Sequence, residues 1–259
     1  MTIMDKLAEH ARERVEIAKA AVSAAEIRNA AFSLPKGDFA FEKALKKDGI
    51  SFICECKKAS PSKGIISADF PYLQIAREYE EAGAECISVL TEPKWFLGSD
   101  RYLQEIASSV GIPCLRKDFT VDEYMIFEAK TLGASAVLFI CSLLSKTQLA
   151  EYLALANELG LSALVETHDA AEISMALEVG ARVIGVNNRD LKDFSVDPGN
   201  SRNLKKLVPD DTVFVSESGI RTAEDVASLR QAGVDAVLVG EALMRASDKK
   251  AKLAELRGL

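Results

Sequence analysis

Short apolar runs recur along the chain from residue 51 onwards, with helical patterns between them. Runs this short, rich in β-branched residues and bounded by turn residues, are typical of buried strands. The stretches between them repeat apolar residues at helical spacing, and several end on a glycine directly before the next run. Each strand is therefore expected to be followed by a helix. The eight runs are SFICECK, ECISVLT, PCLRKDF, SAVLFICS, SALVETH, RVIGVNN, TVFVSES and DAVLVGE.

This alternation predicts a parallel sheet with right-handed crossovers. The runs end near residues 57, 91, 117, 141, 166, 187, 217 and 240, so each interval fits one strand and one helix. Eight such units favour closure into a (β/α)8 TIM barrel, an α/β fold, over an open doubly wound sheet. Barrels of this kind commonly contain about 250 residues. We therefore expect residues 1–259 to form a single barrel domain.

A different pattern precedes the repeats. Apolar residues from Ile3 to Val15 recur at steps of one or two helical turns and predict an amphipathic helix. Thr2 is placed to cap this helix, and Asp5 three residues later suits a capping box. A linker and a short helix around 39–47 are expected to follow. Residues 1–48 are thus predicted to form a helical extension of the barrel.

The charge and hydropathy of the chain exclude several classes of partner. The formal net charge is −7, whereas a nucleic-acid surface needs a basic face. No stretch approaches the roughly 18 apolar residues of a membrane span. The charged N-terminus also lacks the apolar core of a signal peptide. We therefore expect a cytoplasmic protein that binds neither nucleic acid nor membrane.

The sequence has no motif for metal binding or nucleophilic catalysis. The five cysteines lie in strand-like runs without zinc-ligand spacing, so they are interpreted as buried reduced thiols. No HExxH, P-loop, GxGxxG or Ser–His–Asp pattern is present. His10 is expected on a solvated helix face, and His168 as a surface or capping residue. Acid–base chemistry would then fall to lysine and glutamate, with no metal.

Ionisable residues cluster where the predicted strands end, which is where barrels of this type place their sites. The period of two puts Glu55 and Lys57 on one face of the first strand, while Lys117, Glu166 and Glu217 end three others. Taken singly, each charge is compatible with a strand end in solvent. Five charges in one register instead predict an acid–base site, because buried charges are found mainly when paired or functional.

Two glycine-containing turns predict a phosphate site. Ser218 and Gly219 follow the seventh strand, and Gly240 follows the eighth. Glycine lets the backbone approach an anion, and these two loops often bind phosphate in barrel enzymes. The loop after the first strand, 58–64, is small, polar and basic. It suits a mobile lid, an anion clamp or an ordinary solvated loop.

Seven runs occur in the order and spacing of one enzyme family. They are ECKKASPSKG, SVLTEPKWFLGS, LRKDF, ALVETH, GVNNRDL, VSESGI and LVGEALM. On these runs the chain from about residue 50 resembles the indole-3-glycerol-phosphate synthase family. That family converts 1-(2-carboxyphenylamino)-1-deoxyribulose 5-phosphate into indole-3-glycerol phosphate, carbon dioxide and water, without metal or organic cofactor, in tryptophan biosynthesis. The resemblance implies the same reaction here and places the extension 1–48 over the barrel mouth.

The resemblance also implies roles for the ionisable residues. Lys117, in the KDF run, is the expected general acid that protonates the substrate ketone. Glu166 is the expected general base of the final dehydration. Glu55 and Lys57 form a second carboxylate–ammonium pair, with the lysine near a substrate carboxylate or phosphate.

Further residues are expected to orient these groups and to hold the substrate. At Glu241, where some relatives carry a small hydroxyl residue, only backbone donation is expected, because a carboxylate would repel phosphate. The alternative interpretation of the residues expected in the aromatic pocket is ordinary core packing. By expected role, the residues are Glu217 and Asn187 for orientation within the catalytic set, Ser60 and Arg189 for anion and sugar contacts, Phe96, Phe119 and Leu138 for the aromatic pocket, and Ser218, Gly219 and Gly240 for phosphate.

Two alternative functions stay open at this point. A barrel of the phosphoribosylanthranilate isomerase type needs one acid and one base, which leaves no obvious use for two lysines and three glutamates. A non-catalytic scaffold barrel would be expected to have lost its polar strand ends, and they are intact here. The expected partner is a small phosphorylated molecule. The oligomeric state is left open, with a monomer favoured.

Overall fold

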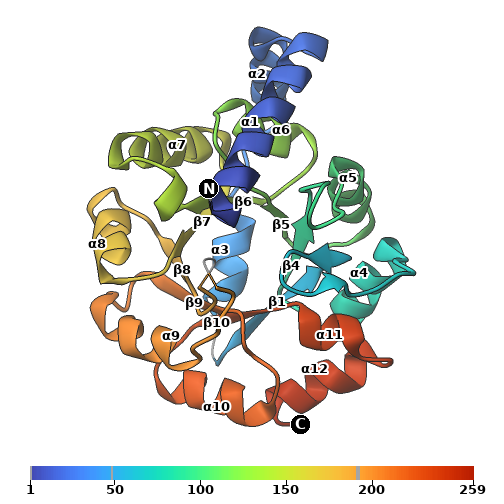
Figure 1. The fold of residues 1–259 in the computed structure, drawn as a ribbon, viewed down its shortest axis with the longest axis vertical. Coiled ribbons are helices and arrows are strands. Elements are labelled where there is room, and N and C mark those ends of the chain that lie inside the picture. Colours follow the sequence, from blue (N-terminus) through green and yellow to red (C-terminus); the bar gives the residue numbers. More distant parts are fainter. Residues whose placement is uncertain (1, 48, 191–192) are drawn as a thin grey trace.

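The computed structural model describes residues 2–47, 49–190 and 193–259, and in these residues eight parallel strands close into one barrel (Figure 1). Barrel strands that follow one another in sequence are neighbours, and β1 closes the ring by pairing with both β4 and β10. The predicted (β/α)8 fold is confirmed, and each predicted strand end lies within one residue of the observed end. The barrel strands are β1 (Ser51–Cys56), β4 (Cys86–Leu90), β5 (Cys114–Lys117), β6 (Ala136–Ile140), β7 (Ser162–Thr167), β8 (Val183–Asn187), β9 (Val213–Glu217) and β10 (Ala236–Val239).

Helices surround this ring of strands. Helices α5, α7, α8, α10 and α12 each begin after a side chain that accepts from a free backbone N–H group; Ser145, for example, caps α7 in a reciprocal capping box with Gln148. None of the described helices is both long enough and apolar enough to cross a membrane. The surrounding helices are α4 (Tyr72–Glu81), α5 (Asp100–Ser109), α6 (Tyr124–Thr131), α7 (Lys146–Leu159), α8 (Ala170–Glu178), α9 (Gly199–Leu204), α10 (Ala223–Gln231), α11 (Glu241–Arg245) and α12 (Lys249–Arg257), with 3-10 turns η1 (Cys141–Leu143) and η2 (Lys205–Leu207).

Two apolar layers stabilise the barrel. Inward-pointing residues such as Leu115, Leu138 and Leu164 fill its interior. Alternate residues, among them Cys54 and Phe139, point outwards and pack in the layer between strands and helices. Burial on both faces explains why the strand runs are almost continuously apolar. The five cysteines are buried and free, as predicted.

Helix α1 (Ile3–Ala21) lies over the C-terminal ends of the strands. Figure 1 shows it running from the middle of the ring to beyond its edge. Leu7 is buried against the barrel interior, and both Ile3 and Leu7 border the cavity between the strand ends. Thr2 and Asp5 form the predicted capping box. The apolar face of α1 therefore holds this helix across the barrel mouth.

The extension contains a helix break that the sequence pattern did not indicate. Val22 is extended, and Ser23 begins a second helix, α2 (Ala24–Ser33), through a capping box with Glu26. Helix α2 packs beside α6, with the ring centroids of Phe32 and Phe127 6.0 Å apart. The capping box of Ser23 and Glu26 is a local feature that apolar periodicity alone does not reveal.

Helix α3 (Ala40–Leu45) lies at the opposite end of the barrel from α1. Its Phe41 and Leu45 are fully buried, and its backbone bonds to Ser51 and Ser162, the first residues of β1 and β7. This position differs from the expectation that the whole of 1–48 overlies the mouth; residues 1 and 48 themselves lie outside the described residues. The apolar pair four residues apart gives α3 a face that closes the N-terminal end of the barrel.

Candidate active site

A cavity of about 400 Å³ opens among the C-terminal ends of the strands. All fourteen residues predicted for the site border this cavity. Their placement brings them together but does not decide what each one does, so their roles stay predictions. They are Glu55, Lys57, Ser60, Phe96, Lys117, Phe119, Leu138, Glu166, Asn187, Arg189, Glu217, Ser218, Gly219 and Gly240.

Lys117 lies at the centre of a cluster of buried charges. It ends β5, and its Nζ donates to Glu166 Oε2 of β7 at 3.2 Å. The same Nζ is 3.5 Å from Glu217 Oε2 of β9. The two carboxylate side chains are 2% exposed and the lysine side chain 15%. These charges therefore point into the barrel mouth, and the alternative of strand ends bending into solvent does not apply to them.

The carboxylates determine the charge state of Lys117. Burial disfavours an ammonium group, but the charges of Glu166, Glu217 and Glu55 outweigh it and raise the pKa of Lys117 above its usual range. Burial would likewise raise the pKa of Glu166, yet the charges of Lys117 and His168 lower it. Lys117 is thus protonated and Glu166 ionised at neutral pH.

For Glu217, in contrast to Glu166, the effect of burial on the pKa outweighs that of the Lys117 charge. Burial, opposed by Lys117 but reinforced by the other carboxylates, raises its pKa to about 7. Its side chain lies against Gly185 of β8, where an added Cβ would stand 2.3 Å from Glu217 Oε1. The glycine therefore gives the carboxylate room inside the barrel. Glu217 therefore titrates near neutral pH.

Glu55 and Lys57 form the second charge pair, as the period of two along β1 predicted. Lys57 Nζ lies 2.5 Å from Glu55 Oε1, and Ser88 Oγ donates to the other carboxylate oxygen at 3.4 Å. A Cβ at Gly240 would stand 2.5 Å from Glu55 Oε1 and 3.0 Å from Lys57 Nζ. The turn after β10 can therefore approach this pair only because residue 240 is glycine.

Asn187 and Arg189 order the wall next to Glu166. Asn187 Nδ2 donates to Glu166 Oε1 at 3.2 Å, and its own Oδ1 accepts from the Arg189 backbone N–H at 3.1 Å. Arg189 Nη1 donates to the carbonyl oxygen of Phe194 at 3.0 Å. One amide thus links the Glu166 carboxylate to the loop after β8. Leu191 of the GVNNRDL run lies outside the described residues.

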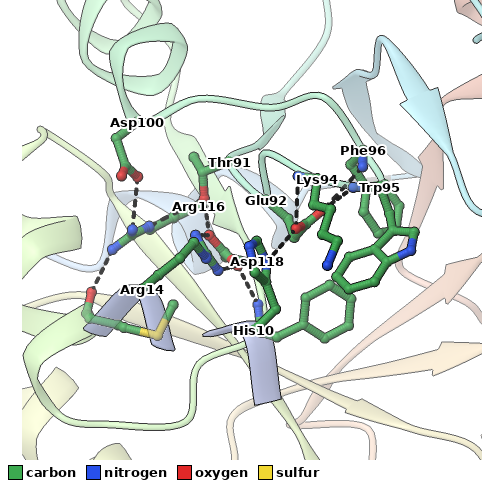
Figure 2. Close-up of polar contacts among 12 residues, drawn as sticks. His10, Arg14, Thr91, Glu92, Lys94, Trp95, Phe96, Asp100, Arg116 and Asp118 are labelled. Atoms are coloured by element: carbon green, nitrogen blue, oxygen red, sulfur yellow. Dashed lines mark hydrogen bonds and ion pairs between the residues drawn. The ribbon is translucent and has the colours of Figure 1, made fainter. Parts of the chain in front are cut away.

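An apolar wall faces the charged groups. The rings of Phe96 and Phe119 have centroids 6.0 Å apart, and Leu138 borders the same cavity. Phe96 is held by the buried carboxylate of Glu92, which accepts backbone N–H bonds from Lys94, Trp95 and Phe96 at 2.7 to 3.0 Å (Figure 2). These hydrogen bonds to Glu92 therefore fix the conformation of the loop that presents Phe96.

Helix α1 is attached to this wall by two polar contacts (Figure 2). Arg14 donates to both carboxylate oxygens of Asp118 at 2.6 and 3.0 Å, and Asp118 in turn accepts the N–H of Phe119. His10 Nδ1 lies 3.1 Å from Glu92 Oε1. The expectation that His10 is solvated is wrong, because the helix face that carries it lies on the barrel and not in water.

The observation that decides the family is a match over almost the whole chain. Residues 4–256 match the family model described as Indole-3-glycerol phosphate synthase. The chain belongs to this family. The indole-3-glycerol phosphate synthase of Ruminiclostridium cellulolyticum is 56% identical over 257 residues, covering 99% of each chain. That of Endomicrobium trichonymphae is 54% identical over 256 residues and covers 98% of this chain and 99% of its own length.

A solved structure supports the fold alone. The 3-hexulose-6-phosphate synthase from Salmonella typhimurium aligns with a TM-score of 0.66 at 14% identity, over 81% of this chain and 97% of that one. The family resemblance inferred from the seven sequence runs is thus confirmed by the sequence matches, whereas the structural match reports the barrel architecture.

Several cavity residues of this family member were not predicted. The loop after β1 is a small hairpin of β2 (Ala59–Ser60) and β3 (Gly64–Ile65), which brings Lys63 to the cavity. Arg245 and Lys252 also border the cavity. Charged residues of this kind are common along helices, and nothing in their spacing distinguishes them from solvated ones. Only the closed barrel turns these C-terminal helices towards the mouth.

Glu241 also borders the cavity, but its charge is paired. Arg245 Nε donates to Glu241 Oε1 at 3.0 Å, one helical turn away. Burial favours the protonated acid, and the bond from Arg245 nevertheless keeps the pKa of Glu241 below its usual value. Among the residues that the structure describes, no group of three or more His, Cys, Asp and Glu side chains is arranged to hold a metal ion.

Proposed function

We propose that this member of the indole-3-glycerol phosphate synthase family converts 1-(2-carboxyphenylamino)-1-deoxyribulose 5-phosphate into indole-3-glycerol phosphate, carbon dioxide and water. The observation that carries the proposal is the contact of Lys117 with two buried carboxylates, beside an aromatic wall in one barrel mouth. This arrangement supplies a proton donor, a proton acceptor and an apolar place for the anilino ring.

Ring closure requires an acid at the substrate ketone. The aromatic carbon that bears the carboxylate attacks the ketone carbon, and the π electrons of the C=O bond move to oxygen. The charged Lys117 stabilises this developing alkoxide and then gives it a proton, since an alkoxide is far more basic than an amine. Its raised pKa favours this role by keeping the group protonated before the attack.

Decarboxylation and dehydration complete the indole. The electrons of the C–COO⁻ bond return to the ring and neutralise the positively charged nitrogen as carbon dioxide leaves. The new hydroxyl then departs as water with a proton from Lys57, and Glu166 accepts the proton released from the ring. Counting all steps, one proton is taken up from solvent in each turnover. Glu166 suits the base role because it is held ionised.

The remaining cavity residues divide between the two ends of the substrate. Phe96, Phe119 and Leu138 would pack against the anilino ring. The phosphate would lie against Ser218, Gly219 and Gly240, where Lys63, Arg245 and Lys252 supply positive charge. Ser60 and Arg189 would contact the sugar and its anions. The cavity of about 400 Å³ is of the size that small-molecule sites have.

We further propose that the chain acts in the cytoplasm as one barrel domain, as a monomer, and with no metal or organic cofactor. The reaction needs neither, because its steps are the acid-assisted attack of a ring carbon on a ketone, proton transfers, and the loss of carbon dioxide and water. Lysine and glutamate supply those proton transfers.

Turnover of the substrate tests the function directly. The purified protein is incubated with the anilino-ribulose phosphate, and indole fluorescence is followed with time. We expect a steady rise in fluorescence with release of one carbon dioxide per indole. Phosphoribosylanthranilate is supplied in a parallel reaction. Turnover of that compound alone would support an isomerase, and binding without carbon dioxide release would support a scaffold.

A further inference from the structure

One side chain contacts Glu166 without having been assigned to the site. His168 follows Glu166 by two residues, so the period of two puts both side chains on the same face of β7 as it ends. His168 Nε2 lies 3.6 Å from Glu166 Oε1. This nitrogen is buried and has no hydrogen-bond partner among the described residues. The contact corrects the expectation of a surface or capping residue.

The imidazole ring is held in this orientation from its far side. His168 Nδ1 lies 3.2 Å from Glu172 Oε2, and the same oxygen accepts the backbone N–H of His168 at 2.7 Å. The carbonyl oxygen of His168 accepts from Asn200 Nδ2 at 3.1 Å. With the backbone and Nδ1 both fixed, Nε2 can point only towards Glu166. A ring free to serve as an ordinary helix cap would not need this double attachment.

We propose that His168 is a positioning residue for the general base: a cationic imidazole that fixes Glu166 Oε1 and keeps this carboxylate ionised for the dehydration step. The proposal rests on the proposed function, because Glu166 has a base role only in that reaction. His168 itself need not touch the substrate. It acts through the oxygen that Asn187 also contacts, and leaves Glu166 Oε2 to Lys117.

The carboxylates Glu166 and Glu217 outnumber the ammonium group of Lys117 that they share, which leaves a place for a second cation. Glu166 and Glu217 share Lys117, while Glu55 is paired with Lys57. One ammonium cannot neutralise two buried carboxylates. A positive charge beside Glu166 favours ionisation of that carboxylate, so Glu217 is the one of the two that takes up a proton more readily.

The groups that face His168 support a charged ring. They are Glu166 at the end of β7, Glu172 on α8 and Glu217 at the end of β9. Burial disfavours the imidazolium, but these three carboxylates, with the hydrogen bond to Glu172 the strongest of their effects, raise the pKa of His168 to about 9. The opposing cation is Lys117, which lies on the other oxygen of Glu166.

The test is the pH profile of kcat/KM for His168→Asn, which removes the charge but keeps a polar side chain. Without the cation the pKa of Glu166 rises, so the acidic limb should move upwards by about one pH unit. Activity should therefore fall about ten-fold at the acidic end and stay close to the wild-type value where Glu166 is ionised anyway. His168→Lys, which restores a positive charge, should move the limb back.

A second variant changes Glu172, the carboxylate on the other side of the His168 ring. Glu172→Gln weakens the attachment of Nδ1 and should shift the acidic limb in the same direction by a smaller amount. Glu178→Gln, an exposed carboxylate on the same helix that pairs with Lys146, is the matched control and should leave the profile unchanged. A loss of folded protein that is equal at every pH lowers the rate without moving the limb, so it does not imitate the shift.

An equal loss of activity at every pH, or no loss at any pH, in His168→Asn would overturn the proposal. A shift that His168→Lys fails to reverse would also overturn it, since the charge would then be irrelevant. The wild-type protein separates this failure from failure of the function. If the wild type turns over the anilino-ribulose phosphate and the His168 profile does not move, only the positioning role is wrong. If the wild type is inactive, the proposed function is wrong.

Discussion

Lys117 and the carboxylates around it depend on one another for their charge. Glu166 and Glu217 are buried within 3.5 Å of the ammonium nitrogen. An unpaired charge in such a place is costly, so removing one partner changes the ionisation of the others as well as the chemistry. A substitution of Lys117 removes a proton donor and also a positive charge, so its tests have to separate these two effects.

Lys117→Ala should lower kcat by at least about a thousand-fold, because it removes the only predicted acid at the ketone and the stabilising charge on the alkoxide. Substrate binding should be largely kept, since the phosphate and ring contacts are untouched. The chain should still fold, with a lower stability because two buried carboxylates lose their cation. The measurement is steady-state indole fluorescence together with thermal unfolding. Lys146→Ala, at an exposed lysine, is the control. Near-normal turnover of Lys117→Ala would remove the acid role.

Glu217→Gln should make the folded protein more stable than the wild type at alkaline pH. The pKa of Glu217 is about 7 in the folded chain against an ordinary value of 4.5. Folding therefore takes up a proton in this window, and the wild type loses stability as pH rises from about 4.5 to about 7. The loss is on the order of a few kcal/mol and stays constant at higher pH.

Denaturant unfolding across the pH range measures this effect. The stability advantage of Glu217→Gln should vanish below about pH 4.5, where the acid is protonated in both states. Glu151→Gln, at an exposed position on α7, should show no such pH dependence. If the two variants have parallel profiles, Glu217 does not have a raised pKa in the folded chain.

At the scale of elements, α1 is joined to the strand end that carries Lys117. Arg14 pairs with Asp118, the residue after Lys117, and Asp118 also accepts from Thr91 Oγ1 and from the N–H of Phe119 (Figure 2). Burial alone would raise the pKa of Asp118, and the Arg14 guanidinium keeps it below its usual value. The extension thus stabilises the strand end that carries Lys117 together with the aromatic wall.

Arg14→Gln should reduce the free energy of unfolding by about 1–3 kcal/mol at neutral pH, because Asp118 stays buried without its main partner. It should also lower kcat/KM about ten-fold, since small displacements of catalytic groups are costly. Arg12→Gln, two residues earlier on the exposed face of α1, should change neither quantity. Equal effects of the two substitutions would show that the ion pair does not position the site.

The sequence predicted those elements whose patterns are local and repeated. The strand ends at Lys117, Glu166 and Glu217 follow from apolar runs that stop at a charge, and their inward orientation follows from the period of two. Helix α3 was misplaced because nothing in its sequence tells which end of a barrel its apolar face will cover. His168 was misjudged for a related reason: its partner Glu172 holds it beside Glu166, and this depends on where α8 packs.

At the scale of the whole molecule, closure of the barrel makes the site. β5, β7 and β9 are distant in sequence, and they contribute Lys117, Glu166 and Glu217 because alternate strands of the ring point side chains into one interior. A single sequence shows eight strand–helix units but not the contacts across the ring. Those contacts determine the pKa values and the pairing of charges, so they had to come from the structure.

In the proposed reaction, Lys117 and Glu166 act at successive steps on one bound substrate. A single-turnover experiment with excess enzyme, following carbon dioxide and indole fluorescence in parallel, tests it most directly. The wild type should release both together. Lys117→Ala should release neither, because ring closure fails. Glu166→Gln should release carbon dioxide in a burst while indole lags behind it, because only the dehydration is slowed. Simultaneous and undiminished release of both products by Glu166→Gln, or a carbon dioxide burst from Lys117→Ala, would contradict the assignment.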